Sequence, residues 1–368
     1  MHWTYRSALD EAFVPSILEL GEWIARKQQG RKASMVLASG TLQRASCTAN
    51  YIQQGAGEVI SGNIRFDENL NEVDTGLWEN RTFEEIKLNE HQLFEERGKA
   101  LGYFHFPQGE SIYEAGVRLE KGLNRFRQET KENLIIVSHS GAIRAFLCKL
   151  LGLSTNDYRK LGAANISSAI LLDDGENLCV ERCGYKPSCL LNEPELKELY
   201  QVYNVPEWII AHMKKTAEMA ETLKPSLKEK KLDWDLIQKA ALVHDMLRTE
   251  RLHALKGADI LRREGYYEIA DLVEKHHDPE IQEDGPLTEA EVLFYADSRV
   301  KEDEIVSVEA RYQASYGKCR CLEAFRKHEA LYRKAKIIEK KDNIVERLKA
   351  IGMHYNTYFA MHTDGFRC

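Results

Sequence analysis

Histidine and aspartate side chains recur beside successive apolar stretches in the second half of the chain. His244 and Asp245 are adjacent and follow the apolar segment LIQKAALV. Burying either side chain is costly unless it has a partner, and a metal ion is one such partner. Imidazole and carboxylate ligands together suit Mn, Fe, Zn, Co or Ni rather than Ca. The candidate metal ligands are His212, His244, Asp245, His253, His276, His277 and Asp297.

Each of these residues also has a simpler interpretation. A single histidine on an apolar helix face is usually a hydrogen-bonded core residue. His276 and His277 suit the carboxyl end of a helix, where the helix dipole favours positive charge, and Asp297 suits an ion pair with Arg299. The occurrence of the whole set on successive helices favours a site for one or two divalent ions over these alternatives.

The sequence around these residues resembles the HD-domain superfamily of metal-dependent phosphohydrolases. The matching segments are AHMKKTA, AALVHDMLR, HALKGADIL, VEKHHD and YADSRV. The resemblance implies that one metal ion is held by His212, His244, Asp245 and Asp297. It also implies a second ion, bridged by Asp245 and held by His253 with one or both of His276 and His277.

The same resemblance implies catalytic roles for His244, Asp245 and Arg248. A pair of divalent ions polarises a phosphoryl oxygen and lowers the pKa of water, which is what phosphoester hydrolysis needs. Arg248 stands where many family members have lysine; both residues suit a substrate phosphate but differ in geometry. Lys256 and Arg299 are further candidates to face a phosphate, although each is more commonly a surface charge.

A second candidate site lies in the first half of the chain. Arg44 follows the apolar run SMVLAS, and His139 follows the run LIIVS. Ligands of open α/β sheets bind beyond the carboxyl ends of the strands, and the helix N-termini that follow favour an anion. Together with a carboxylate such as Glu72, these residues predict a phosphate site.

These segments resemble the histidine phosphatase (phosphoglycerate mutase-like) superfamily. The matching segments are SGTLQRASCTA, NLNEVDTGLWEN, FPQGES and VSHSGAIRAFL. The resemblance implies that Arg44 is the second pocket arginine, Glu72 the proton donor and His139 the second pocket histidine. The Arg-His-Gly motif that carries the family's nucleophile does not occur in this sequence, and His2 is the one histidine before the helix expected at Ser16–Arg26.

The departure leaves two interpretations of the first domain. Either the chain begins late and lacks its first strand, or the domain is a binding or scaffolding relic without phosphoenzyme chemistry. A missing central strand would expose sheet edges and apolar surface.

The elements that must position these residues change in character along the chain. Short apolar runs alternate with helical stretches up to about residue 184, and helical spacing dominates after that. The first helix expected in the second half opens at Pro206 and is terminated by Pro225. The further expected helices are Asp235–Leu247, Ala254–Arg263, Tyr266–His276 and Thr288–Val300. The predicted fold is an α/β N-terminal domain, phosphoglycerate mutase-like but missing its first strand, plus an all-α HD-type C-terminal domain. The predicted boundaries are 1–185 for the first domain, 186–198 for a linker, 199–310 for the HD domain and 311–368 for a helical extension.

Composition limits the classes of partner. The 368 residues carry a net charge of −7, which is too acidic for a protein whose main partner is nucleic acid. No apolar run is long enough to span a membrane, and residues 1–22 lack the apolar region of a signal peptide. The eight cysteines do not form a disulfide framework, and Cys319 and Cys321 are expected to be free thiols. We therefore expect a cytoplasmic protein with a small phosphorylated substrate.

The sequence thus predicts a hydrolase that acts through the HD domain on a nucleotide or another small phosphoester. Two alternatives remain open. The first is a histidine phosphatase with a phosphohistidine intermediate, if the N-terminus is incomplete. The second is a non-catalytic accessory or sensor protein that binds phosphorylated metabolites.

Overall fold

The computed structural model describes residues 8–29, 34–227, 231–341 and 344. The chain divides between Asn192 and Glu193 into two compact units, here called unit 1 and unit 2. Each unit has its own hydrophobic core. Within the described residues, no helix is both long enough and apolar enough to cross a bilayer.

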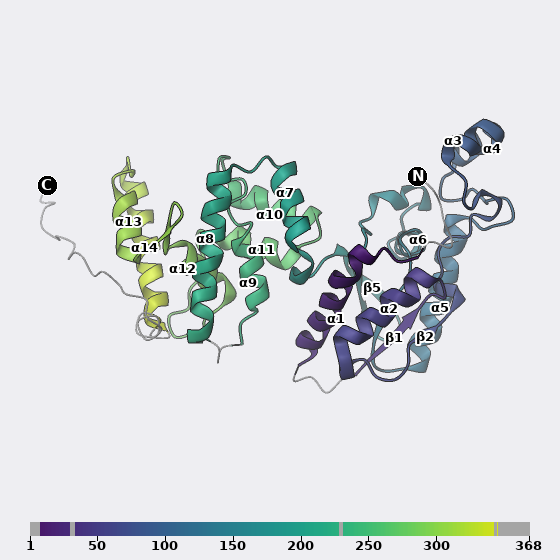
Figure 1. The fold of residues 1–368 in the computed structure, drawn as a ribbon, viewed down its shortest axis with the longest axis horizontal. Helices are drawn as coiled ribbons and strands as arrows, with labels where there is room; N and C mark the ends of the chain where they lie inside the picture. Colours follow the sequence, from purple (N-terminus) through teal and green to yellow (C-terminus); the bar gives the residue numbers. More distant parts are fainter. Residues whose placement is uncertain (1–7, 30–33, 228–230, 342–343, 345–368) are drawn as a thin grey trace, which may run out of the picture. The chain divides into compact units, whose positions relative to one another are not determined.

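Unit 1 is an α/β unit (Figure 1). Its helices are α1 (Val14–Gln28), α2 (Gln43–Ala56), α3 (Phe83–Asn89), α4 (His91–Lys99), α5 (Ile112–Glu129) and α6 (Ser140–Leu150). Its strands are β1 (Met35–Ser39), β2 (Arg65–Phe66), β3 (Asn133–Val137), β4 (Ser168–Asp173) and β5 (Leu178–Tyr185). Short 3-10 turns join several of them, including η3 (Glu68–Leu70) and η5 (Thr155–Lys160).

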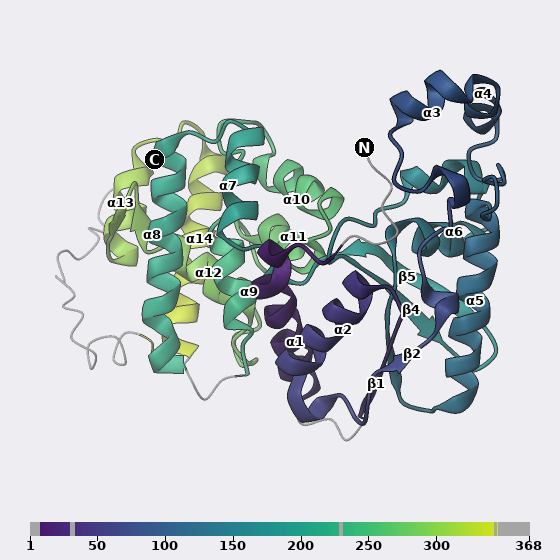
Figure 2. The same ribbon diagram turned by 45° about the vertical axis from the view of Figure 1, so that its right-hand side comes forward.

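The strands of unit 1 form two separate sheets. One is a parallel sheet in the order β2-β1-β3, in which Met35 pairs with Asn133 and Ser39 with Val137. The other is the antiparallel hairpin β4-β5. Figure 2 shows α1 and α2 on one side of the strands and α5 on the other, as expected for parallel strands. In the order β2-β1-β3, β3 has a strand on one side only, so among the described residues it is an edge strand. Its residues 134–136 are half-buried, whereas most of β1 is buried.

Close packing of α1 on α2 depends on two glycines. A Cβ added at Gly21 would lie 2.4 Å from the carbonyl oxygen of Ile52, and one at Gly55 would lie 2.3 Å from that of Leu18. The two helix backbones therefore touch, and any side chain at either position would separate them. The helix expected at Ser16–Arg26 lies inside α1.

Capping chemistry starts α5, the longest helix of unit 1. Ser111 accepts a hydrogen bond from the backbone amide of Glu114, and the Glu114 carboxylate accepts one from the amide of Ser111. This capping box provides hydrogen-bond acceptors for two backbone amides that have no acceptor within the helix. The buried face of α5 then packs on α6 through Gly116, whose missing side chain leaves room for the backbone of Ala145.

Unit 2 is almost entirely helical (Figure 1). Its helices are α7 (Glu193–Val202), α8 (Glu207–Leu223), α9 (Trp234–Ala241), α10 (His253–Arg263), α11 (Tyr267–Lys275), α12 (Glu289–Asp297), α13 (Val308–Tyr316) and α14 (Leu322–Lys341). Between α12 and α13 lies a small antiparallel hairpin of β6 (Val300–Lys301) and β7 (Glu304–Ile305). The stretch expected to be a linker, 186–198, contains a 3-10 turn at Ser188–Leu190 and the start of α7.

The helix expected over Asp235–Leu247 ends earlier, at Ala241. Residues 242–249 form successive tight turns, because Val243, Met246 and Arg248 each donate to the carbonyl three residues before. The helix expected to reach Val300 likewise ends at Asp297. In both places the helix stops at or just before a candidate metal ligand, which frees that ligand from the helical register.

The residues expected to form a C-terminal extension pack into the core of unit 2. Ala335 and Ile338 of α14 belong to the same buried cluster as Phe294 and Tyr295 of α12. Tyr295 also donates a hydrogen bond of 3.1 Å to Glu339, and both side chains are buried. The helix α14 therefore supports α12, which carries Asp297.

Candidate functional site

The structure brings the seven candidate metal ligands of unit 2 together. His212 lies within α8, whereas the other six lie at or beyond helix ends. Their ligand atoms form two groups, within each of which all atoms lie within 4.8 Å of one another. The first group is His212, His244 and Asp297, and the second is Asp245, His253, His276 and His277.

Backbone carbonyls orient three of the histidines. The Nδ1 atom lies 2.8 Å from the carbonyl oxygen of Glu302 in His212, 2.8 Å from that of Ala241 in His244, and 2.6 Å from that of Val273 in His276. A carbonyl only accepts hydrogen bonds, so each Nδ1 carries a proton. Nε2 of His212 lies 3.0 Å from Oδ1 of Asp297. In the neutral rings of His244 and His276, Nε2 keeps its lone pair. The Nε2 atom of each ring faces the cluster, which is the orientation that metal-binding histidines need.

Asp245 lies between the two groups. Its Oδ2 is 3.6 Å from Nε2 of His212 and 3.6 Å from Nε2 of His244. Its Oδ1 is 3.1 Å from Nε2 of His253 and 3.5 Å from Nε2 of His276. One carboxylate therefore offers one oxygen to each group.

Neighbouring histidines offset the cost of burying the carboxylates of Asp245 and Asp297. Burial alone would raise the pKa of Asp245, but His244, His253 and His276 outweigh it and hold the pKa well below its usual value. Burial would also raise the pKa of Asp297, and His212 and His244 lower it in the same way. Both carboxylates are therefore anionic near neutral pH.

The donor set fits a divalent metal ion. Nε2 of His244 and Nε2 of His276 are buried and have no hydrogen-bond partner among the residues that the structure describes. Buried polar atoms without a partner are rare and costly, and a metal ion would satisfy both. The imidazole and carboxylate donors match ions such as Zn, Mn, Fe, Co or Ni. No cysteine belongs to either group, and Cys319 and Cys321 are free thiols.

The predicted phosphate partners of unit 2 have different surroundings. Nη1 of Arg248 lies 2.9 Å from Oδ2 of Asp245, and the side chain is partly exposed. Lys256 instead pairs with Glu250 on the surface. The expectation that Arg299 is a surface charge was wrong, because its guanidinium is buried and donates to Tyr295 and to the carbonyl of Val306.

Unit 1 places Glu72 and His139 at one end of α6. His139 is the N-cap residue of α6. The Glu72 carboxylate accepts hydrogen bonds from the amides of Gly141 and Ala142, at 3.4 and 3.1 Å. The sequence predicted that these amides would favour a bound anion, and the carboxyl group of Glu72 accepts their hydrogen bonds instead. Burial raises the pKa of Glu72 more than these hydrogen bonds and the charge of Arg44 lower it.

His139 is a buried base with an unused ring atom. Burial, together with the positive charges of Arg44 and Arg118, lowers the pKa of His139 to about 3. The ring is therefore neutral near pH 7. Its Nε2 atom is buried and, within the described part of the chain, has no hydrogen-bond partner. Arg44 is the second residue of α2, and its charge acts on both His139 and Glu72.

Two residues that position this end of unit 1 were not predicted. Arg118 donates to the carbonyls of Glu68, Asn69, Asn71 and Glu72, and thereby fixes the loop that carries Glu72. Asn71 accepts a hydrogen bond of 2.7 Å from the amide of Thr41, just before α2. The sequence signal was weak, since an arginine inside a helix and an asparagine in a loop are both common. His2 lies outside the described residues.

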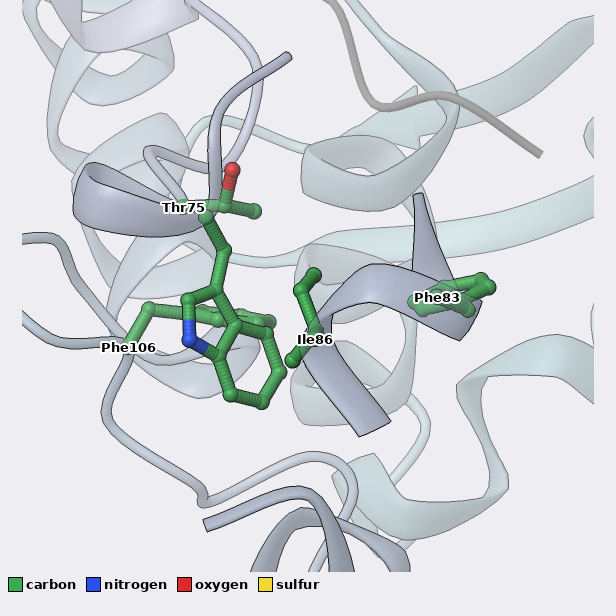
Figure 3. A pocket seen from close by; sticks show the side chains of 5 residues that line it. Thr75, Phe83, Ile86 and Phe106 are labelled. Atoms are coloured by element: carbon green, nitrogen blue, oxygen red, sulfur yellow. The ribbon is translucent and has the colours of Figure 1, made fainter. Parts of the chain in front are cut away.

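A small pocket elsewhere in unit 1 has a mostly apolar lining (Figure 3). Its lining residues are Thr75, Trp78, Phe83, Ile86 and Phe106. Thr75 supplies the one hydroxyl, which donates to Glu79. The pocket offers no charged group to a phosphate, so it is a packing feature of the α3 region and not the predicted phosphate site.

Family comparison now identifies both units. Residues 17–184 match the histidine phosphatase superfamily (branch 1), and residues 209–301 match the HD domain. The chain joins a histidine phosphatase superfamily domain to an HD domain. The predicted fold classes, α/β followed by mostly helical, are confirmed, and both matched families are families of phosphatases or phosphohydrolases.

Individual relatives match parts of the chain. A tRNA (cytidine(56)-2'-O)-methyltransferase of Thermoplasma volcanium is 30% identical over 146 residues, which are 33% of this chain and 42% of the relative. Phosphoserine phosphatase 1 of Hydrogenobacter thermophilus is 26% identical over 183 residues, 48% of this chain and 82% of the relative. The superposition on the structure of the α-ribazole phosphatase of Shigella flexneri covers 50% of this chain and 88% of that protein, with 15% sequence identity and a TM-score of 0.42. The chain thus spans less than half of the methyltransferase.

Proposed function

We propose that unit 2 is a metal-dependent phosphohydrolase that acts on a nucleotide or another small phosphoester. The observation that carries the proposal is the position of Asp245, whose two carboxylate oxygens face two groups of histidines. The match to the HD domain supports the same chemistry. Bound divalent ions would supply Lewis-acid activation of a phosphoryl oxygen and of water.

Each residue of the cluster has a proposed role. His212, His244 and Asp297 would hold one ion, and His253, His276 and His277 would hold a second, with Asp245 available to both groups. The carbonyls of Glu302, Ala241 and Val273 bind Nδ1 of three of the rings and so orient their Nε2 atoms toward the cluster, where a metal ion would bind. Arg248 is partly exposed beside Asp245, so its remaining donors are available to orient a phosphate.

The proposal is tested by metal analysis and phosphate release. The purified full-length chain is assayed with phosphomonoesters before chelation, after chelation, and after addition of single divalent metals. We expect bound metal, loss of activity on chelation, and recovery with at least one metal. Activity that survives complete removal of metal would contradict the proposal. Bound metal without turnover of any phosphoester would instead favour a sensor or accessory protein.

A second candidate function concerns unit 1. We propose that it binds a phosphorylated ligand at Arg44 and His139 without forming a phosphoenzyme. The observation that favours binding is the buried Nε2 of His139, which has no partner among the described residues. Glu72 already occupies the nearby helix amides, which reduces the attraction for a second anion.

Radiolabelled substrate distinguishes binding from phosphoenzyme chemistry in unit 1. Binding of inorganic phosphate or vanadate that is lost in a His139→Ala variant, without acid-labile label on the protein, supports a binding domain. Trapped label at a histidine would support the alternative of a histidine phosphatase with a phosphohistidine intermediate.

A further inference from the structure

Trp208 is a large aromatic side chain that unit 2 leaves 58% exposed. It is the second residue of α8, four residues before His212. Residues four apart on a helix share a face and lie about one turn apart. Since His212 faces the metal-ligand cluster, Trp208 stands on the same side of α8, one turn nearer the start of the helix.

Arg248 connects this tryptophan to the cluster. Its guanidinium carbon lies 5.9 Å from the centroid of the Trp208 ring, and its Nη1 lies 2.9 Å from Oδ2 of Asp245. The side chain is 32% exposed, so it is not enclosed by the two contacts. Three chemically different groups therefore follow one another: metal-ligating atoms, a guanidinium, and an exposed indole.

The backbone next to the second histidine group adds an exposed apolar side chain. Leu252 immediately precedes His253 and is 71% exposed. Its φ is +58°, a conformation that leucine adopts at a cost. The strain and the exposure occur together one residue from a candidate metal ligand. Charged groups and exposed apolar side chains therefore both occur next to the metal-ligand cluster.

We propose that Trp208 is a stacking platform for the base of a nucleoside phosphate, with Arg248 placed to contact its phosphate. The inference rests on the proposed function of unit 2 and narrows its substrate class from small phosphoesters in general to nucleotides. A base offers a flat π face to the indole, and such stacking tolerates any base. Arg248 contacts both the indole of Trp208 and Asp245. A nucleotide whose base stacks on Trp208 would therefore direct its phosphate toward Arg248 and the metal-ligand cluster.

The test compares two ligands that differ in the base alone. Adenosine 5'-monophosphate and ribose 5-phosphate are titrated by calorimetry into the full-length chain, both metal-free and loaded with Mn. The variants are Trp208→Ala, Trp208→Leu and Trp208→Phe, and thermal unfolding checks that each is folded. Trp208→Leu keeps apolar bulk without a flat ring, whereas Trp208→Phe keeps a flat ring.

We expect the wild-type chain to bind adenosine 5'-monophosphate about tenfold or more tightly than ribose 5-phosphate. Trp208→Ala and Trp208→Leu should remove that difference without changing the affinity for ribose 5-phosphate, and Trp208→Phe should keep most of it. Adenosine 5'-monophosphate should also quench tryptophan fluorescence in the wild type and not in Trp208→Phe.

Three results would overturn the inference: equal affinity for both ligands, equal weakening of both by Trp208→Ala, or no binding of the nucleotide at millimolar concentration in either metal state. Chelator-sensitive hydrolysis without preference for the nucleotide would overturn the stacking role and leave the proposed function standing. Selective nucleotide binding without hydrolysis of any phosphoester would overturn the proposed function and leave the stacking role of Trp208 standing.

Discussion

Oδ1 of Asp245 lies 3.1 Å from Nε2 of His253. The other oxygen of the same carboxylate faces His212 and His244 at 3.6 Å. A carboxylate that offers one oxygen to each of two ligand groups is suited to bridge two ions. This relationship links the two groups into one proposed centre, and it leads to separable predictions for each side.

The two metal groups should respond separately to loss of one histidine. His212→Ala removes a ligand from the first group, and His253→Ala removes one from the second. Each variant should weaken metal binding at its own group by at least about tenfold to 100-fold and leave the other group occupied. Metal content after dialysis measures this, with the exposed His91→Ala as the control. Complete loss of metal from both variants would show that the groups do not bind independently.

Removing the charge of Glu72 should strengthen anion binding in unit 1. Glu72→Gln keeps an oxygen for the amides of α6 but removes the negative charge there. Inorganic phosphate should then bind about tenfold more tightly. Repulsion between a carboxylate and a phosphate a few ångströms apart costs about 1 kcal/mol or more, and the variant lacks it. Glu68→Gln, an exposed residue on the same loop, is the control. Unchanged affinity, measured by calorimetry, would place the anion away from α6.

His139 should make unit 1 less stable in acid. Its pKa of about 3 in the folded chain lies below the ordinary histidine value of 6.5. The unfolded chain therefore takes up a proton below about pH 6.5, whereas the folded chain stays neutral until about pH 3. Stability from this group is complete above pH 6.5 and falls by about 2 kcal/mol between pH 7 and pH 5.

Urea unfolding at both pH values measures this dependence. Glutamine does not titrate, so the His139→Gln variant should lack this contribution. Between pH 7 and pH 5 its free energy of unfolding should fall by about 2 kcal/mol less than that of the wild type. An identical pH dependence in wild type and variant would mean that His139 is not buried as a neutral ring.

The sequence could predict the metal-ligand cluster because apolar spacing and ligand chemistry agreed. His212 on an apolar face and the pair of His244 and Asp245 after an apolar helix required partners, and those partners had to be one another or a metal. The α/β and helical textures likewise predicted the two fold classes. These inferences needed no knowledge of how side chains pack.

Other features depend on tertiary contacts that spacing does not encode. The helix before His244 ends at Ala241, because the following amides donate to carbonyls three residues back and His244 uses the Ala241 carbonyl. Arg299 is buried because Tyr295 and the Val306 carbonyl accept its hydrogen bonds. Glu72 accepts amide hydrogen bonds at the start of α6, and Arg118 donates to the backbone carbonyl of Glu72. Trp208 carried no sequence signal, since its exposure beside Arg248 is visible only in the structure.

The rate of phosphate release by an Asp245→Asn variant tests the central claim most directly. Asparagine preserves the size of the side chain but cannot bridge two ions as a carboxylate does. We expect a loss of more than about 100-fold in rate together with a loss of bound metal, because a ligand to both groups is removed. The exposed Asp284→Asn variant should behave as the wild type. Phosphate release by Asp245→Asn at the wild-type rate, with the protein free of metal, would contradict the account.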